Sequence, residues 1–355
     1  MKRRQILRLL TALAFSLTVG PYAGDAAAQT VMKLAHYAPP GIANSDEEAM
    51  AQTFKSIVEK QSQGRLKVEI YPAAQLGNVR EMAESTKLGV IHGNIIFTSL
   101  AGTFAPKIWL IGIPYLFRDQ YHAWQVLDGD FGRELADAVR KETGLRVLAW
   151  AEGDGFRQVF NSVRPIQKVE DLKGMKIRVP ESKGLLAMFQ AYGALPVTIT
   201  WTETYTALQT KVADGAEPEI GSAKNIKMNE VQKYLLLTNH SYNTHLLWVN
   251  DKWFSALSAD LQSIILDAAR IAKIANRGLS VVRTYMYLDE FEKQGMQVTA
   301  PSAKALEDFR KLGQPAYIGA IEKDIGKDWV QKALRAARTA EERIKGENQR
   351  ETAKK

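Results

Sequence analysis

Residues 171–180 read Asp-Leu-Lys-Gly-Met-Lys-Ile-Arg-Val-Pro, and they contain a strand pattern from Met175 to Val179. A helical pattern follows over Gly184 to Ala191, and another strand pattern over Pro196 to Ile199. A strand, a helix and a strand in this order predict a β-α-β unit with parallel strands. Arg178 falls at the carboxyl end of the first of these strands, the edge where α/β sheets place their ligand crevices.

The same alternation extends toward the N-terminus. Strand patterns over Val31 to His36 and Leu66 to Tyr71 flank an amphipathic helical pattern over Ser45 to Ser62. Further segments of these kinds are the strand candidates Val90 to Phe97 and Arg146 to Ala151 and the helix candidate Val79 to Leu88. Strands that alternate with helices in this way predict an α/β fold, with mainly parallel strands covered by helices.

One helical pattern is unusually long. Apolar residues recur at helical spacing from Ala259 to Gln294, Ser258 is a plausible N-cap, and Gly295 is a plausible stop. A continuous helix here, at about 1.5 Å per residue, is longer than one compact domain requires, so we expect it to lie across two. The alternative is two helices broken near Gly278.

The first 28 residues have the organisation of a secretory signal peptide. Four basic residues among the first eight precede an apolar run from Leu9 to Val19, and small residues follow at Ala26 to Ala28. The run is shorter than the roughly 20 residues that a membrane-spanning helix needs. We therefore expect cleavage after Ala28 and a periplasmic protein that does not itself span the membrane; an uncleaved anchor is the alternative. Arg3-Arg4 also resembles a twin-arginine export signal, and the sequence does not decide the route.

The composition limits the classes of protein to consider. The chain has no cysteine, which excludes disulfides, thiolate metal sites and a cysteine nucleophile. Its formal charge of +8 falls to +5 without residues 1–28, which hold four basic residues and one acidic residue. The remaining basic residues are scattered among acids, so nucleic-acid binding is not expected. The chain is long enough for two domains, and its charged end, residues 346–355, is expected to be a flexible tail.

Local signatures of catalysis are missing from the sequence. The five histidines form no H-E-x-x-H pattern, and His240 and His245 do not share a helical face, so no metal site is predicted. The chain has no G-x-S-x-G nucleophile elbow, no Walker loop and no dinucleotide-binding glycine motif opening a helix. We therefore expect no cofactor and no enzyme activity. A periplasmic hydrolase or lyase with dispersed acid and base residues stays an alternative.

Segments along almost the whole mature chain resemble the substrate-binding proteins of tripartite ATP-independent periplasmic (TRAP) transporters, of the dicarboxylate-binding-like family. They occur in the family's order and at similar spacing, which makes the match specific to the family but not to a ligand. The segments are Gln63 to Leu66, Ile70 to Gly77, Ile113 to Phe117, Gly155 to Gln158, Asn161-Ser162, Asp171 to Pro180, Gly193 to Pro196, Glu203 to Tyr205, Ala207 to Gln209, Asp214 to Glu217, Glu230 to Tyr234 and Leu237 to His240.

The resemblance implies two α/β lobes joined by crossing strands, with a cleft between them and a long helix spanning both. It divides the chain into a signal peptide over residues 1–28, a first lobe over 29–152 plus 240–283, a second lobe over 153–239 plus 284–345, and the tail. A protein of this family captures a small organic acid and delivers it to the membrane subunits of a TRAP permease. A module that reports to a sensor kinase is a further alternative to the enzyme.

The resemblance also implies the residues that hold the ligand. Arg178 takes the place of the carboxylate clamp, and a guanidinium suits this role because its planar fork matches a carboxylate bidentately. Arg157 matches the family's second cleft arginine, with a structural salt bridge as the alternative. Tyr205 and Glu217 fall near the cleft by family position, and Glu217 leaves open a bound cation, although no oxygen-rich loop requires one.

Three aromatic residues suggest the class of ligand. Trp201 stands at the position of a family aromatic, and Tyr37 and Phe97 replace polar residues of sialic-acid-binding members. Buried ligand hydroxyls without partners cost about 1–3 kcal/mol each, so sialic acid is disfavoured. We expect a compact monocarboxylate with an apolar or aromatic body, unless the two arginines each grip a carboxylate, which would favour a dicarboxylate. Core packing is the alternative role of the three rings.

Overall fold

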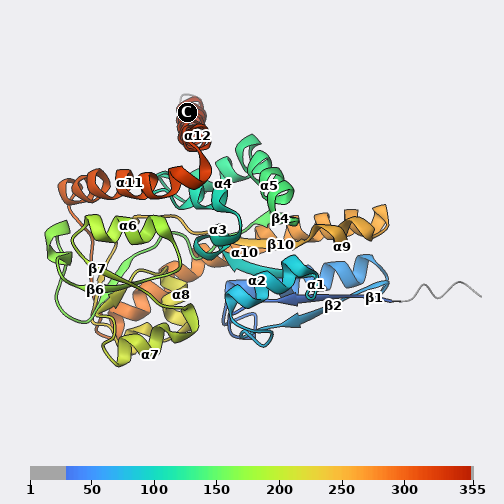
Figure 1. The fold of residues 1–355 in the computed structure, drawn as a ribbon, viewed down its shortest axis with the longest axis horizontal. Helices are drawn as coiled ribbons and strands as arrows, with labels where there is room; N and C mark the ends of the chain where they lie inside the picture. The colour runs from blue at the N-terminus through green and yellow to red at the C-terminus, as the bar shows by residue number, and fades with distance from the viewer. Residues whose placement is uncertain (1–28, 353–355) are drawn as a thin grey trace, which may run out of the picture.

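The computed structural model describes residues 29–352, and it shows two lobes, each built on its own sheet (Figure 1). The expected signal peptide lies outside the described residues, as do residues 353–355. Within residues 29–352, no helix combines the length and the apolar character needed to cross a membrane. The α/β class expected from the sequence is confirmed, and each sheet has covering helices.

The first lobe is built on a five-stranded sheet with the order β2-β1-β3-β10-β4. Strands β2, β1 and β3 are parallel, whereas β10 runs antiparallel to both β3 and β4. All six residues of β10 are buried, and the strand lies between β3 and β4. The strands are β1 Thr30–Ala35, β2 Leu66–Tyr71, β3 Gly93–Phe97, β4 Leu145–Trp150 and β10 His245–Asn250.

The helices of the first lobe begin and end at recognisable caps. In α2, Val79–Leu88, a capping box joins Asn78 and Glu81, and Gly89 ends the helix in the left-handed conformation. The bounds expected from the sequence are therefore reproduced for this helix. The other helices are α1 Asp46–Gln61, α3 Thr98–Phe104, α4 Gln120–Leu127, α5 Asp130–Thr143 and α9 Asp251–Ala256, with a 3-10 helix over Pro106–Gly112.

The second lobe is built on a six-stranded sheet with the order β11-β9-β5-β8-β6-β7. Its strands β8, β6 and β7 are parallel, and β5 runs antiparallel to both of its neighbours. The strands are β5 Val159–Asn161, β6 Lys176–Val179, β7 Leu195–Thr198, β8 Gly215–Ala216, β9 Tyr234–Leu236 and β11 Gln297–Thr299. The helices are α6 Lys183–Ala191, α7 Thr204–Gln209, α8 Ile220–Asn225 and α11 Ala303–Ile325, with 3-10 helices over Val169–Leu172, Trp201–Glu203 and Met228–Glu230.

A single long helix, α10, ties the two lobes together. It runs unbroken from Ala259 to Lys293 and packs on α1 of the first lobe and α8 of the second. The expectation of a continuous helix is thus confirmed, and the alternative break at Gly278 does not occur. In Figure 1 the helix crosses the middle of the molecule, from the side of α9 to the side of α8.

The last helix returns to the first lobe. After α11 has packed on α6, α12 runs from Lys327 to Thr352 and contacts α4 and α5 (Figure 1). Residues 346–352, expected as a flexible tail, are helical here. The helix buries small residues at helical spacing, Ala333, Ala337 and Ala340, and continues from this anchored part into exposed charged turns.

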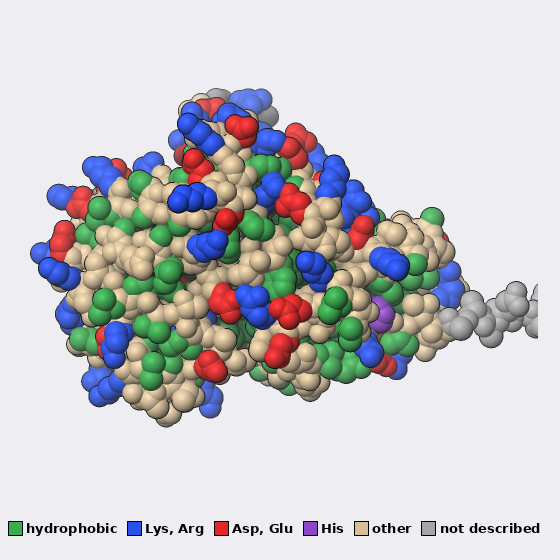
Figure 2. Space-filling model, in the orientation of Figure 1, with side chains coloured by type: hydrophobic (Ala, Val, Ile, Leu, Met, Phe, Trp, Pro, Cys, Tyr) green, Lys and Arg blue, Asp and Glu red, His purple; other side chains and the backbone are tan. Residues whose placement is uncertain are grey.

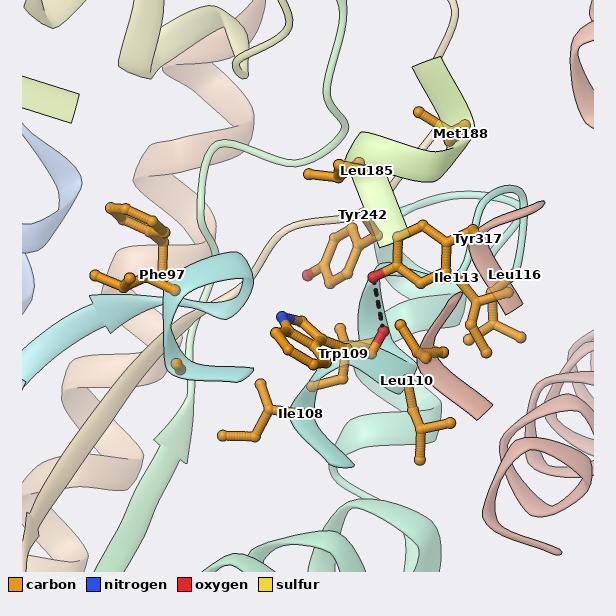
Figure 3. Packing of buried hydrophobic residues seen from close by; sticks show 14 of the residues in the cluster. Phe97, Ile108, Trp109, Leu110, Ile113, Leu116, Leu185, Met188, Tyr242 and Tyr317 are labelled. Atoms are coloured by element: carbon orange, nitrogen blue, oxygen red, sulfur yellow. Dashed lines mark hydrogen bonds between the residues drawn. The ribbon is translucent and has the colours of Figure 1, made fainter. Parts of the chain in front are cut away.

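Buried aromatic residues join α11 to the first lobe. Tyr317 is 2% exposed, and its hydroxyl donates a 2.9 Å hydrogen bond to the carbonyl of Trp109. Figure 3 shows this pair among Leu110, Ile113 and neighbouring side chains, with Phe97 to one side of the group. The core of the molecule is therefore continuous across the two lobes, and Phe97 marks its border with the space between them.

We expect two helix glycines to respond oppositely to alanine. Gly278→Ala in α10 should raise the free energy of unfolding by about 0.5–1 kcal/mol, because no atom lies within 4 Å of the added Cβ and glycine disfavours helix. Gly313→Ala in α11 should lower it by about 1–3 kcal/mol, because the Cβ would lie 2.1 Å from the hydroxyl of Tyr192. Urea denaturation measures both, and destabilisation by Gly278→Ala would contradict the open surroundings described.

Candidate functional site

A cavity of about 260 Å³ lies where the two lobes meet. A second cavity, of about 540 Å³, adjoins it and shares Phe97, Arg178, Pro180 and Trp201 with it. The smaller cavity is lined by Tyr37, Phe97 and Ser99 from the first lobe, by Arg178, Pro180, Trp201, Glu219 and Ser222 from the second, and by Arg157 and Asn243 from the connecting segments. We call this smaller cavity the pocket.

Arg178 is the cation of the pocket that has no carboxylate partner. It lies in β6, is 1% exposed, and its Nε donates a 2.9 Å hydrogen bond to the carbonyl of Ile199. Burial lowers the pKa of Arg178 to about 10, which leaves the guanidinium charged at neutral pH. Of the four buried arginines within residues 29–352, the other three form ion pairs: Arg157, Arg277 and Arg283. Arg178 therefore keeps donors for a group that enters from the cavity.

Arg157 is held by two carboxylates of the second lobe. Its Nε and Nη2 donate to the two oxygens of Glu217 at 2.5 and 2.7 Å, and its Nη1 donates to Glu219 at 2.6 Å. All three side chains are at most 5% exposed. This arrangement is the salt bridge that the sequence left open as an alternative for Arg157, and it compensates the cation fully. Arg157 still lines the pocket, but its charge is satisfied within the protein.

Three aromatic side chains form the apolar walls of the pocket. Tyr37 and Phe97 pack edge to face, with ring centroids 5.4 Å apart, on the first-lobe side. Trp201 faces them from the second lobe, and the Arg178 guanidinium lies 5.4 Å from the centre of its ring. The Tyr37 hydroxyl lies 2.9 Å from His245 Nε2. The structure thus brings Arg178, Trp201, Tyr37 and Phe97 to one place, as expected from the sequence.

Two of the expected site residues lie elsewhere. Glu217 is completely buried behind Arg157, and its second neighbour is His240 Nε2 at 3.2 Å. Burial raises the pKa of the Glu217 carboxyl, but Arg157 and His240 lower it by more, so the pKa lies below its usual value. Glu217 is therefore the counter-ion of Arg157. Tyr205 donates its hydroxyl to Glu230 at 2.9 Å, at an exposed position outside the lining of the pocket.

An ion pair joins the lobes at the larger cavity. Arg80, from α2 of the first lobe, donates to Glu181, which follows β6 in the second, and both residues line that cavity. The Arg80 guanidinium also lies 5.4 Å from the centre of the Phe104 ring. In Figure 2 acidic and basic side chains lie side by side between the two lobes. The approach to Arg178 is therefore bounded by side chains of both lobes.

Sequence reasoning missed several polar residues of the pocket. Ser99 follows β3, Asn243 precedes β10, and Glu219 precedes α8, and none of them belongs to a recognisable motif. Only the position of Glu219, two residues after Glu217, hints that it shares the neighbourhood of Arg157. Within residues 29–352, no group of three or more His, Asp or Glu side chains is placed to hold a metal ion.

A family model places this architecture among known proteins. Residues 34–324 match the model of the bacterial extracellular solute-binding proteins, family 7, known as DctP. The chain belongs to this family. It is a solute-binding receptor of the TRAP type, not an enzyme, as the resemblance had implied.

Individual relatives agree with the family model. The 2,3-diketo-L-gulonate-binding periplasmic protein of Escherichia coli is 33% identical over 73% of this chain and 78% of its own. Among solved structures, the sugar acid binding protein of Advenella mimigardefordensis in complex with galactonate has a TM-score of 0.82 at 29% identity, over 88% of this chain and 99% of its own. A TRAP periplasmic solute-binding protein of Polaromonas bound to D-erythronate has a TM-score of 0.80 at 35% identity, over 86% and 98%. The two-lobed fold is therefore confirmed.

Removal of each pocket arginine should affect the unliganded protein differently. Arg157→Met leaves Glu217 and Glu219 buried without their cation, so the free energy of unfolding should fall by about 3–5 kcal/mol. Arg178→Met removes a buried charge that has no carboxylate partner, so the loss should stay below about 1 kcal/mol, or stability should rise. Urea denaturation without ligand compares them, and equal losses would make Arg178 a structural residue.

Proposed function

We propose that the chain captures a small organic acid in the pocket, with Arg178 as the carboxylate clamp, and delivers it to the membrane subunits of a TRAP permease. The observation that carries this proposal is the buried Arg178 guanidinium, which lacks a carboxylate partner and borders both cavities. A ligand carboxylate would supply the missing charge and accept two parallel hydrogen bonds.

The other residues of the site follow from their contacts. Trp201, Tyr37 and Phe97 would contact the body of the ligand, because they form the apolar walls around Arg178. We assign Arg157 and Glu217 a supporting role: they form a buried ion pair that shapes the pocket beside Arg178. Tyr205 receives no role in binding, since its hydroxyl is engaged by Glu230 outside the pocket.

The aromatic walls support a compact monocarboxylate with an apolar or aromatic body. Such a ligand gains about 25 cal/mol for each Å² of apolar surface that the rings remove from water. A dicarboxylate is disfavoured by the geometry of Arg157, whose donors already face Glu217 and Glu219. The solved relatives named above hold galactonate and D-erythronate, which supports a carboxylate as the shared feature of the ligands.

The site of action follows from the N-terminal sequence and the family. We propose that residues 1–28 direct export and are removed after Ala28, and that the mature receptor works in the periplasm. We also propose that ligand closes the lobes about the segments that connect them, because a ligand held by both lobes gives the closed form contacts that the open form lacks.

Replacement of Arg178 tests the clamp. Arg178→Lys and Arg178→Ala should each weaken acid binding by about 2–5 kcal/mol, since lysine offers no planar fork and alanine offers no charge. Titration calorimetry measures the affinity, and circular dichroism checks the fold. Binding at the wild-type affinity by Arg178→Lys would rule out a bidentate clamp.

A ligand panel tests the class of acid. We expect a branched or aromatic 2-hydroxy or 2-oxo acid to bind more tightly than a C4-dicarboxylate, a hexuronate or sialic acid, because the rings cannot compensate the desolvation of several hydroxyls. A thermal-shift screen followed by calorimetry ranks the four classes; saturating ligand at a hundred times its Kd adds about 2.7 kcal/mol. Tightest binding of either sugar acid would contradict the assignment of the walls but not the receptor function.

A further inference from the structure

Besides Arg178, one unsatisfied polar side chain lines the pocket and another, Glu47, lies outside the lining near Tyr37. Ser99 lines the pocket and is 7% exposed, and its hydroxyl has no hydrogen-bond partner among the described residues. Glu47 is 1% exposed, and neither of its oxygens has a partner there. A buried polar group without a partner costs about 1–3 kcal/mol, so native proteins rarely keep several together without a use.

These groups gather around Tyr37, on the first-lobe side of the pocket. Glu47 Oε1 lies 3.5 Å from His245 Nε2, and the same ring nitrogen lies 2.9 Å from the Tyr37 hydroxyl. Burial, and then the charges of Glu47, Asp154 and Glu219, raise the pKa of Tyr37 well above its usual value. Acidic groups therefore surround the end of the pocket where Tyr37 lies.

Glu219 brings acceptor capacity directly to the lining of the pocket. It is 3% exposed, and Arg157 Nη1 is the one donor from another residue that its carboxylate receives among the described hydrogen bonds. Ser222, also in the lining, donates its hydroxyl to Asp154 at 3.1 Å. The Glu219 carboxyl oxygen that Arg157 does not occupy can accept a hydrogen bond from a ligand donor.

Charges are distributed unevenly around the pocket. The buried guanidinium groups of its lining are those of Arg157 and Arg178, whereas the buried carboxyl groups of Glu47, Asp154 and Glu219 act on the Tyr37 hydroxyl. Burial raises the pKa of Asp154 well above its usual value, and the nearby carboxyl groups of Asp46 and Glu47 raise it further. A ligand carboxylate is compensated at Arg178, but a second carboxylate on the Tyr37 side would lie beside buried carboxyl groups without a free cation, which disfavours its charged form.

We propose that the pocket has two poles: Arg178 takes the carboxylate, and Glu219, with Ser99 and Asn243, takes a hydrogen-bond donor elsewhere on the same ligand. The ligand is then a compact acid that also carries a hydroxyl or an ammonium group, and the pocket discriminates against unsubstituted and dicarboxylic acids. This inference depends on the proposed function, because it concerns the same pocket.

The test uses acids that differ only in the group farthest from the carboxylate. Butanoate, 4-hydroxybutanoate, 4-aminobutanoate and succinate, with the corresponding five-carbon acids, are titrated into the wild-type protein by calorimetry. In at least one chain length, the hydroxy or amino acid should bind at least tenfold more tightly than the unsubstituted acid and the diacid. The tighter binder of the hydroxy acid and the amino acid shows whether the preferred donor is a hydroxyl or an ammonium group. Equal binding of the unsubstituted acid, or tightest binding of the diacid, would overturn the inference.

Two variants test whether this preference depends on Ser99 and Glu219. Ser99→Ala removes a hydroxyl that has no protein partner, and Glu219→Gln removes one acceptor charge while it keeps the shape. Each should reduce the tenfold preference to threefold or less. Glu230→Gln, which makes the same change outside the pocket, is the matched control and should keep the full preference.

The outcomes separate the two proposals. If the preference is unchanged in Ser99→Ala and Glu219→Gln, these two side chains are not its cause and the inference fails. If acids bind through Arg178 but the distant group makes no difference, only this inference fails. If no acid binds the wild-type protein, the proposed function fails, and this inference fails with it.

Discussion

The buried guanidinium of Arg178 has no carboxylate partner in the protein, and the rest of the site is arranged around this uncompensated charge. Taking an unpaired cation out of water costs free energy, which is why buried charges are nearly always paired. Here β6 fixes the side chain, the Ile199 carbonyl orients it, and Trp201 covers its face. Its remaining donors have no acceptor among the described residues, so under the proposed function the unliganded protein loses stability that a bound anion restores.

The ion pairs of Arg157 leave Arg178 without a carboxylate partner. Both carboxylates that could neutralise Arg178 from nearby, Glu217 and Glu219, are bonded to Arg157 instead. One arginine is therefore paired with carboxylates and the other is not, although both line the pocket and both occur in segments that resemble the family. The fold contributes by bringing the two lobes together at this point, through the paired connecting segments at Phe156 and Tyr242 and the continuous helix α10.

Local patterns predicted much of the fold, and long-range contacts account for what they did not predict. The bounds of α2 follow from its caps and β2 from its alternation, so both were predictable. Strand β10 was missed because all six of its residues are buried, which removes the alternation that marks a strand. The arginine clamp was expected from a motif, but the partners of Arg157 lie about 60 residues away and its pairing could not be read from the sequence. Ser99 and Asn243 reach the pocket from separate elements, without a shared pattern.

We propose that a ligand carboxylate compensates the buried charge of Arg178, which has no carboxylate partner in the protein. The most direct measurement compares the affinity of the wild-type protein for 2-hydroxy-3-methylbutanoate and for its primary amide, which has nearly the same shape but no charge. If the account is right, the acid binds and the amide binds at least a hundredfold more weakly, a difference of about 2.7 kcal/mol, because only the acid compensates the buried cation. Equal affinity for the acid and the amide would show that Arg178 does not recognise a carboxylate.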